Sequence, residues 1–340
     1  MLSQQLVDHD KINWSRFESF LRSHFENIPE GEMEVEKFTE GYSNQTYLIK
    51  IREWEGVMRR PPFGEIPLRA HDMEREYKIL KEISAWYDLA PKPYVYEEDS
   101  TIMDKHFYVM ERIRGIVIDE KLPADFQDSI TYGPIISKAF VGALVKLHGI
   151  SCSQGNLLSI GKPEGYLERQ VHGWIKRFHK ARTDNVQTSN DLENWLVANI
   201  PTTTETTIVH NDFKLNNLIF KENQINEIIG VIDWELATIG DPMTDLGSSI
   251  VYWMEPGDPD LGVTAVTNQA GFLTRREFAE AYARTSGRDL SDINYYVTFG
   301  FYKLAGILQQ IYQRWYNGSL NDPRFEKLYV AVNNLLEMAE

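Results

Sequence analysis

Two short apolar segments in the second half of the chain each lead into an acidic residue. The first is Ile208-Val209, which precedes Asp212, and the second is Ile228-Ile-Gly-Val-Ile232, which precedes Asp233. Apolar runs of this length are typical of buried strands, and a loop that leaves such a strand is held rigidly by it. The chain is therefore expected to fold around strands that fix these two carboxylates in place.

The residues around the two acids have a spacing typical of phosphoryl transfer. In His210-x-Asp212-x-x-x-x-Asn217, an Asp that accepts a hydroxyl proton precedes an Asn that binds Mg²⁺, and Asp233 takes the place of the second metal ligand. The reaction needs hard oxygen ligands, a base beside the acceptor hydroxyl and cations on the phosphates. Lys214 is expected to neutralise charge on the transferred group, with a solvated loop lysine as the alternative.

Simpler interpretations exist for each of these residues alone. A pattern of this kind can arise by chance, and a carboxylate after a strand is often a helix cap. His210 fits a hydrogen-bonded structural histidine as well as a catalytic one, so we assign it no proton-transfer role. The combination of base and metal ligands with an upstream nucleotide-binding half favours the catalytic interpretation.

Four further segments, spread over nearly the whole chain, accompany the two catalytic segments. They are Phe38-Thr-Glu-Gly-Tyr-Ser-Asn-Gln-Thr-Tyr47, Gly165-Tyr-Leu-Glu-Arg-Gln170, Gly240-Asp-Pro-Met-Thr-Asp-Leu246 and Ser286-Gly-Arg-Asp-Leu290. With these segments the chain resembles the aminoglycoside phosphotransferase family, within the larger group of choline-kinase-like and protein-kinase-like enzymes. It is most similar to the standalone bacterial phosphotransferases and to the kinase domains fused to acyl-CoA dehydrogenases.

The resemblance implies an α+β, protein-kinase-like fold of two lobes. The N-terminal lobe is expected to hold an antiparallel sheet of five strands, and the C-terminal lobe to be mainly helical. The implied activity is that of a kinase that moves the γ-phosphoryl group of ATP, with Mg²⁺, to an alcohol group of a small molecule. Catalysis is then expected from Asp212 and Lys214, and metal binding from Asn217 and Asp233.

A phosphate-binding turn is expected near the N-terminus. Gly41-Tyr-Ser-Asn44 lies between two predicted strands, so its amides and the side chains of Ser43 and Asn44 could cover the ATP phosphates. Only one glycine is present, and without the resemblance a plain hairpin tip would be the first interpretation.

The resemblance also implies a strand cation that binds phosphate and pairs with a helix glutamate. Arg59 and Glu76 match these positions, with Arg60 and Glu74 as alternatives and surface ion pairing as the simpler interpretation. The connector that follows the sheet normally meets the adenine edge in kinases. This implies nucleotide contacts from Glu111 and Ile113.

Three further residues are expected to shape the catalytic loop. Asn211 stands where the family commonly has glycine, and asparagine tolerates left-handed backbone angles better than most residues. Asp241 and Asp245 are expected to brace the loop rather than to bind metal.

The predicted organisation is an N-terminal nucleotide-binding lobe (residues 1–110), a connector (111–115) and a helical C-terminal lobe (116–340). A leading helix is expected over 12–25, and strands and one helix of the first lobe over 33–38, 46–52, 57–60, 70–86, 94–96 and 107–110. A hairpin turn is expected at Glu53-Trp-Glu-Gly56. Helices of the second lobe are expected over 140–148, 165–181, 192–200, 275–284, 292–316 and 323–338.

Composition narrows the possible partners and compartment. The formal charge of −15 opposes binding to nucleic acid or an anionic membrane. The single cysteine, Cys152, excludes an internal disulfide, and the first ten residues carry acids where a signal peptide needs a basic start. These features favour a cytoplasmic protein. The apolar segment 295–316 contains Lys303 and other polar residues, which indicates a core helix.

The acceptor is expected to be bound by Trp174 and the aromatic segment 252–316. An amphipathic pocket there would suit a hydroxylated metabolite of partly apolar character, such as a hydroxyacyl thioester, because polycationic aminoglycosides would need several converging carboxylates. The alternatives are a true aminoglycoside kinase, an inactive nucleotide-binding regulatory module and a protein kinase. The last is disfavoured because no activation segment with an Ala-Pro-Glu ending follows Asp233.

Overall fold

The structure is a computed structural model that describes residues 12–38, 44–63, 71–187, 189–202, 205–263 and 265–340. The chain divides into two compact units. The first contains residues up to Arg114 together with Ile232–Glu235, and the second contains Gly115–Val231 and Leu236–Glu340. Asp233 therefore belongs to the first unit, although the strand that precedes it belongs to the second.

The first unit is built on a five-stranded antiparallel sheet, which confirms the predicted fold class. Its spatial order is β1-β2-β3-β5-β4. The strands are β1 (Glu34–Lys37), β2 (Gln45–Ile51), β3 (Trp54–Arg60), β4 (Pro93–Glu97) and β5 (Phe107–Glu111).

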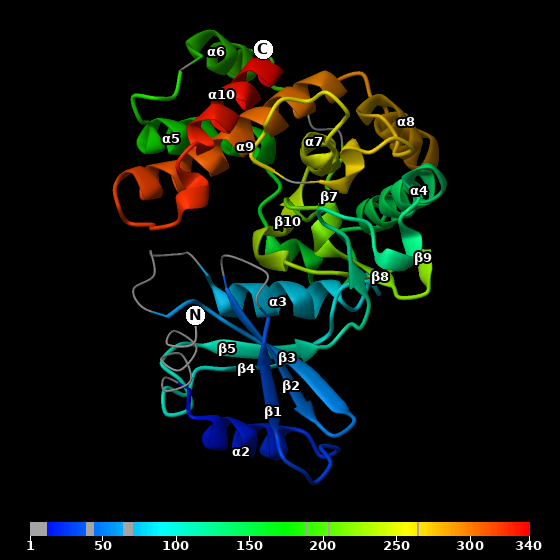
Figure 1. Cartoon of the computed structure of the whole chain (residues 1–340), viewed down its shortest axis with the longest axis vertical. Coiled ribbons are helices and arrows are strands. Elements are labelled where there is room, and N and C mark those ends of the chain that lie inside the picture. The colour runs from blue at the N-terminus through cyan, green and yellow to red at the C-terminus, as the bar shows by residue number, and fades with distance from the viewer. Residues whose placement is uncertain (1–11, 39–43, 64–70, 188, 203–204, 264) are drawn as a thin grey trace. The chain divides into compact units, whose positions relative to one another are not determined.

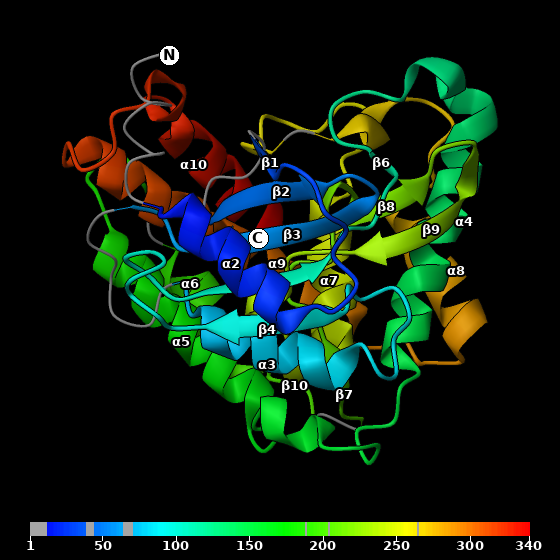
Figure 2. The same cartoon turned by 90° about the horizontal axis from the view of Figure 1, so that it is seen from below.

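Two helices cover the sheet, α2 (Trp14–His24) on one face and α3 (Met73–Ile83) on the other (Figure 1 and Figure 2). Side chains alternate along each strand between these helices. On β5, Phe107 contacts the rings of α2, whereas Tyr108 contacts the ring of Tyr77 on α3. On β3 the same alternation places Met58 in a hydrophobic cluster with Phe17 and Phe20 of α2, and it turns Arg59 towards α3.

The predicted turn between β2 and β3 begins one residue and ends three residues too late. Ile51 pairs with Trp54, so the turn consists of Arg52 and Glu53, and Arg52 has a φ of 52°. Gly56 lies within β3, where a Cβ atom would come 2.7 Å from the Trp54 ring. That glycine is needed for close packing rather than for a turn.

The second unit contains two small antiparallel sheets that carry the catalytic loop. β7 (Thr207–Val209) pairs with β10 (Thr238–Gly240), and β6 (Ile116–Val117) pairs with β8 (Leu218–Lys221), which pairs with β9 (Gln224–Val231). The loop 210–217 thus leaves one buried strand and enters another. Gly115 precedes β6 where a Cβ atom would lie 2.3 Å from the Phe220 carbonyl oxygen.

Helices form the rest of the second unit. They are α4 (Ser129–His148), α5 (Tyr166–Ala181), α6 (Asn190–Ala198), α7 (Pro242–Tyr252), α8 (Arg275–Ser286), α9 (Ile293–Tyr316) and α10 (Leu328–Ala339). The long helix α9 packs against α5, α7 and α10, and many of its apolar residues belong to one hydrophobic core cluster with residues of these helices.

Three helix predictions need correction. α4 begins at Ser129 rather than at Phe140, because Asp128 caps its first turn and Pro134 is accommodated inside it. A short 3₁₀ turn (Pro323–Phe325) precedes α10, where one continuous helix was expected. The helix α7 was not predicted at all.

Within the described residues, α4 has the length and composition of a membrane-spanning helix, with a mean hydropathy of 1.3 over its best window. The core helix of a globular domain passes the same test. In this chain α4 packs against α8 and β9, and its buried His148 bonds to Tyr282 of α8.

Candidate active site

A buried carboxylate holds the start of the catalytic loop. Asp245 is fully buried near the N-terminus of α7, and its two oxygens accept the backbone N–H groups of His210 (2.5 Å) and Asn211 (2.6 Å). His148 lies 3.3 Å from the same carboxylate. Burial raises the pKa of Asp245, but the interactions with His148 and His210 together outweigh burial, so the pKa is lowered. Asp245 therefore braces the loop, while Asp241 caps α7 and accepts a hydrogen bond from Tyr296.

Asn211 adopts the left-handed conformation, with a φ of 66°. Its side-chain oxygen accepts a hydrogen bond from Tyr166 (2.8 Å), and its carbonyl oxygen accepts one from the Lys303 ammonium (2.9 Å). An asparagine is suited to this position because its short polar side chain offsets the cost of the left-handed angle. The backbone next to Asp212 is thus fixed from α5, α7 and α9.

The Asp212 carboxylate lies among donors from its own loop. The Asn217 side-chain amide donates to Asp212 Oδ2 (3.0 Å) and to its backbone carbonyl (2.9 Å), and Lys214 Nζ lies 3.1 Å from the same Oδ2. Tyr252 hydrogen-bonds to Asp212, and burial, followed by the charge and hydrogen bond of Asp212, raises the pKa of the Tyr252 hydroxyl. Asp212, Lys214 and Asn217 are therefore brought together by the second unit.

In the first unit, Arg59 is the cation that faces α3. Its Nε lies 3.3 Å from Glu76 Oε2, and its Nη2 donates to Asp233 Oδ1 at 2.7 Å. Arg60 points to the opposite face of β3 and pairs with Asp104 at 2.6 Å. The structure thus brings together Arg59, Glu76 and Asp233, whereas the alternative Glu74 pairs with the exposed Lys78.

The other predicted nucleotide residues are placed as follows. Asn44 donates to Glu235 Oε2 (3.0 Å) and contacts His71 Nδ1 through its own oxygen (2.8 Å), so its amide lies on the same side of the unit as the Arg59 cluster. Glu111 ends β5 and accepts the Lys92 backbone N–H. Ile113 is half-buried in the connector, and Gly41 and Ser43 lie outside the described residues.

Burial makes Glu76 an unusual carboxylate. It is 1% exposed, and burial raises its pKa to about 7 against the lowering effect of the Arg59 guanidinium. The charges of Asp233 and Glu235 raise the pKa further. Arg59 meanwhile keeps its charge and hydrogen-bonds to Asp233.

This pKa predicts a pH-dependent stability. The pKa is raised from an ordinary 4.5, so the stabilisation by protonated Glu76 is complete below pH 4.5 and is lost as the pH rises through about 7. The wild-type protein should therefore lose up to about 3 kcal/mol of unfolding free energy across this window relative to Glu76→Gln. Urea denaturation at pH 5, 6, 7 and 8 measures the difference. Glu74→Gln on the exposed side of α3 is the control, and a Glu76→Gln difference that is flat with pH would contradict the assignment.

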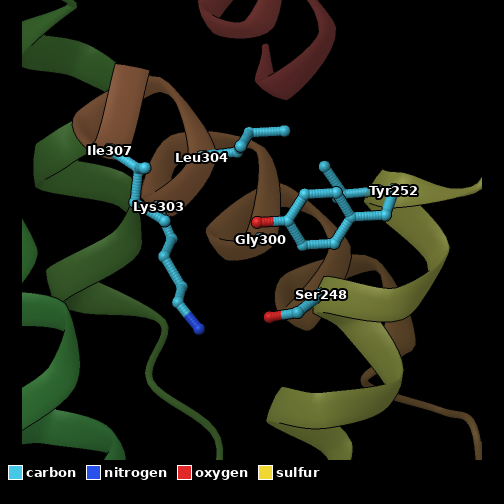
Figure 3. Close-up of a pocket in the computed structure, with 7 residues that line it drawn as sticks. Ser248, Tyr252, Gly300, Lys303, Leu304 and Ile307 are labelled. Carbon is cyan, nitrogen blue, oxygen red and sulfur yellow. The ribbon is translucent and has the colours of Figure 1, made fainter. Parts of the chain in front are cut away.

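A pocket lies beside the catalytic loop in the second unit (Figure 3). It contains about 180 Å³ of empty space, part of it open to solvent, and is lined by Ser248, Val251, Tyr252, Gly300, Lys303, Leu304 and Ile307. Tyr252 is the one lining residue that comes from the predicted aromatic set, because most of those rings are buried in the core. Ser248 and Lys303 were not predicted as site residues, since neither belongs to a recognisable sequence pattern.

Comparison with known proteins identifies the family. The sequence pattern of the phosphotransferase enzyme family (APH) matches residues 34–290. Mouse acyl-CoA dehydrogenase family member 10 is 31% identical over 95% of this chain. Human acyl-CoA dehydrogenase family member 11 is 29% identical over the whole length of this chain. The chain spans only 30% and 44% of these relatives, respectively.

Solved structures show the same fold. A putative aminoglycoside phosphotransferase from Ralstonia eutropha has a TM-score of 0.81 at 27% identity, with 96% of this chain and 97% of that chain covered. Choline kinase from Cryptosporidium parvum (TM-score 0.58, 13% identity, 96% and 97% covered) shares the fold. So does the aminoglycoside phosphotransferase APH(4)-Ia in a complex with ADP and hygromycin B (0.60, 13%, 94% and 97%). The chain therefore belongs to the phosphotransferase enzyme family and has its protein-kinase-like α+β fold.

Proposed function

We propose that this protein transfers the γ-phosphoryl group of ATP to a hydroxyl group of a small metabolite. The observation that carries the proposal is the position of Asp212, whose carboxylate is held between Asn217 and Lys214 beside the pocket-lining Tyr252. A carboxylate fixed in this way can accept a hydroxyl proton while a neighbouring cation stabilises charge on the transferred group. The family membership and the ADP complex of the structural relative support a nucleotide as donor.

The first unit supplies groups for the triphosphate. Arg59 is a buried guanidinium, a permanently charged and planar group of the kind that suits phosphate oxygens. Glu76 fixes the direction of this side chain. Asn44, with Gly41 and Ser43, is proposed to cover the phosphates, and Glu111 and Ile113 to meet the base.

The available donors fit Mg²⁺. The Asn217 amide nitrogen donates to Asp212, which leaves the amide oxygen as an acceptor, and Asp233 offers a carboxylate that is 28% exposed. Oxygen ligands in small number, completed by phosphate oxygens and water, are what Mg²⁺ prefers. When bound, the ion would neutralise charge on the phosphates, and Asn217 and Asp233 would hold it.

The acceptor pocket favours a small or partly apolar molecule. Leu304, Ile307 and Val251 give it an apolar wall, as is common in sites for small molecules. We therefore propose that it receives the hydroxyl-bearing end of a metabolite. A hydroxyacyl thioester is one such molecule, as the names of the acyl-CoA dehydrogenase relatives suggest.

A phosphoryl-transfer screen with purified protein tests the proposal. ADP formation would be measured with MgATP over a library of hydroxylated metabolites and a library of aminoglycosides. Acceptor-dependent ADP release is expected with at least one metabolite. Tight MgATP binding without transfer to any acceptor would instead favour the inactive regulatory module.

Aminoglycosides are expected to be poor acceptors. Among the described residues, those that line the pocket include one cation, Lys303, and no carboxylate, so a polycation would lose hydration without compensation. Steady-state kinetics with kanamycin-type compounds should give kcat/KM far below the ~10⁴ M⁻¹s⁻¹ at the lower end for true substrates. Values that reach this range would show that the protein is an aminoglycoside kinase.

A further inference from the structure

Lys303 is an unusual residue for the middle of a core helix. The whole residue is 8% exposed. Its ammonium makes one hydrogen bond within the described part of the chain, to the Asn211 carbonyl oxygen. An ammonium has three donors, so two of them remain for another acceptor. Figure 3 shows Lys303 Nζ at the same end of the pocket as the Ser248 hydroxyl, with the Leu304 side chain at the other end.

Two residues of α5 lie near the part of α9 that carries Lys303. The Trp174 ring lies against Gly306, where an added Cβ atom would be 3.2 Å from the ring. Gly306 lies about one helical turn after Lys303 on α9. The Arg177 guanidinium stacks over the same ring at 4.7 Å and has no carboxylate partner among the described residues. The Trp174 Nε1 atom is buried and also has no hydrogen-bond partner there.

The charges around Lys303 do not balance. Burial lowers its pKa, Asp245 and Asp212 oppose this effect, and the nearby positive charge of Arg177 lowers the pKa further. Asp245 is already used by two backbone N–H groups, and Asp212 is paired with Lys214. A buried cation without a full set of acceptors is costly, and a bound anion would remove that cost.

We propose that the acceptor carries an anionic group, a carboxylate or a phosphate ester, which Lys303 and Arg177 bind while the hydroxyl of the same molecule lies at Asp212. This rests on the proposed function and deepens it, because it names the chemical class of the acceptor. Ser248 and the Trp174 indole N–H supply further donors to the anion. Lys303 is then a specificity-determining residue that also positions the catalytic loop through Asn211.

A matched series of acceptors tests the inference. Terminal alcohols of three to eight carbons would carry a carboxylate, a phosphate monoester, a carboxamide or an ammonium group at the other end. Calorimetry gives their dissociation constants, and ADP release with MgATP gives kcat/KM. At the best chain length, the carboxylate or the phosphate ester should exceed the carboxamide at least tenfold in both measurements, with the ammonium compound last. Comparison of the carboxylate compounds with the phosphate monoesters shows which of these two anionic groups the site prefers.

Variants test which residues bind the anionic group of the acceptor. Lys303→Met should reduce the preference for anion over carboxamide at least tenfold, and Arg177→Gln should reduce it severalfold through KM and binding rather than kcat. Arg177 is exposed, so its variant keeps the test available if the buried substitution prevents folding. Lys176→Gln removes one charge from the exposed adjacent position of α5 and is the matched control.

The outcomes separate this inference from the proposed function. Equal or better binding of the carboxamide or ammonium series would overturn the inference, and so would a series in which no member binds. Transfer to neutral alcohols with no anion preference would overturn the inference and leave the phosphotransferase function standing. Preferential anion binding without transfer to any hydroxyl would support the inference and contradict the proposed function.

Discussion

Replacement of Asp212 by asparagine should reduce turnover by about 10²–10⁴-fold, the range that general base catalysis contributes. The amide keeps the size of the side chain and can still contact Asn217 and Lys214, which now bond to the carboxylate. It cannot accept the hydroxyl proton. Affinity for MgATP should stay within a few fold, because the carboxylate is proposed to face the acceptor rather than the nucleotide.

Single-turnover kinetics and nucleotide titration measure the two halves of this expectation. Asp125→Asn makes the same chemical change on an exposed turn of the same unit and should leave both quantities unchanged. Undiminished turnover of Asp212→Asn would remove the base assignment. A loss of nucleotide affinity that equals the loss of rate would show that Asp212 acts on the nucleotide instead.

Replacement of Asp233 by alanine should weaken Mg²⁺-dependent nucleotide binding at least tenfold as well as the rate, because the ion joins the protein to the triphosphate. The same change removes the 2.7 Å partner of Arg59, which keeps its contact with Glu76. ATP affinity without magnesium should therefore change much less than affinity with it.

Calorimetry with ATP, in the presence and absence of magnesium, decides the role of Asp233. Glu235→Ala is the matched control, since Glu235 also lies near Arg59, at 3.8 Å, but is not proposed to bind the metal. The control should keep the dependence on magnesium. Equal MgATP affinities for Asp233→Ala and the wild type would contradict the assignment.

The fold of the first unit was well predicted because its patterns are local. The alternation of apolar and polar residues in β2 shows which of its side chains face the core, and the continuous apolar run of β5 is typical of an interior strand buried on both faces. The pairing of Arg59 with Glu76 follows from strand and helix registers once the family pattern is known. The turn at Arg52 was missed because Gly56 looks like a turn residue, whereas it makes room for the Trp54 ring.

The helix α7 could not be predicted from periodicity. Nine of its eleven residues are buried, so no polar face gives it a helical repeat. Its sequence also contains Gly247, Ser248 and Ser249, which are weak helix formers. Asp245 and Tyr252 of α7 were predicted from other patterns, but Ser248 and Val251, which line the pocket, were missed together with the helix.

Lys303 was missed for a different reason. In the sequence it is one of several polar residues that interrupt an apolar helix. Its partner Asn211 is 92 residues away, and a contact at that separation is set by the packing of α9 rather than by any local pattern. The proposed base and metal ligands follow a spacing that can be recognised in the sequence, whereas the residues that line the pocket are dispersed over the helical unit.

Direct detection of the product tests the central claim. An acceptor from the screen would be incubated with MgATP and the wild-type protein, and phosphorus NMR would follow the products, with Asp212→Asn as the parallel sample. The account predicts a new phosphate monoester signal that grows in step with ADP for the wild type and is nearly absent for the variant. ATP that is bound but yields no phosphate ester, or ester formation that is equal in both samples, would contradict it.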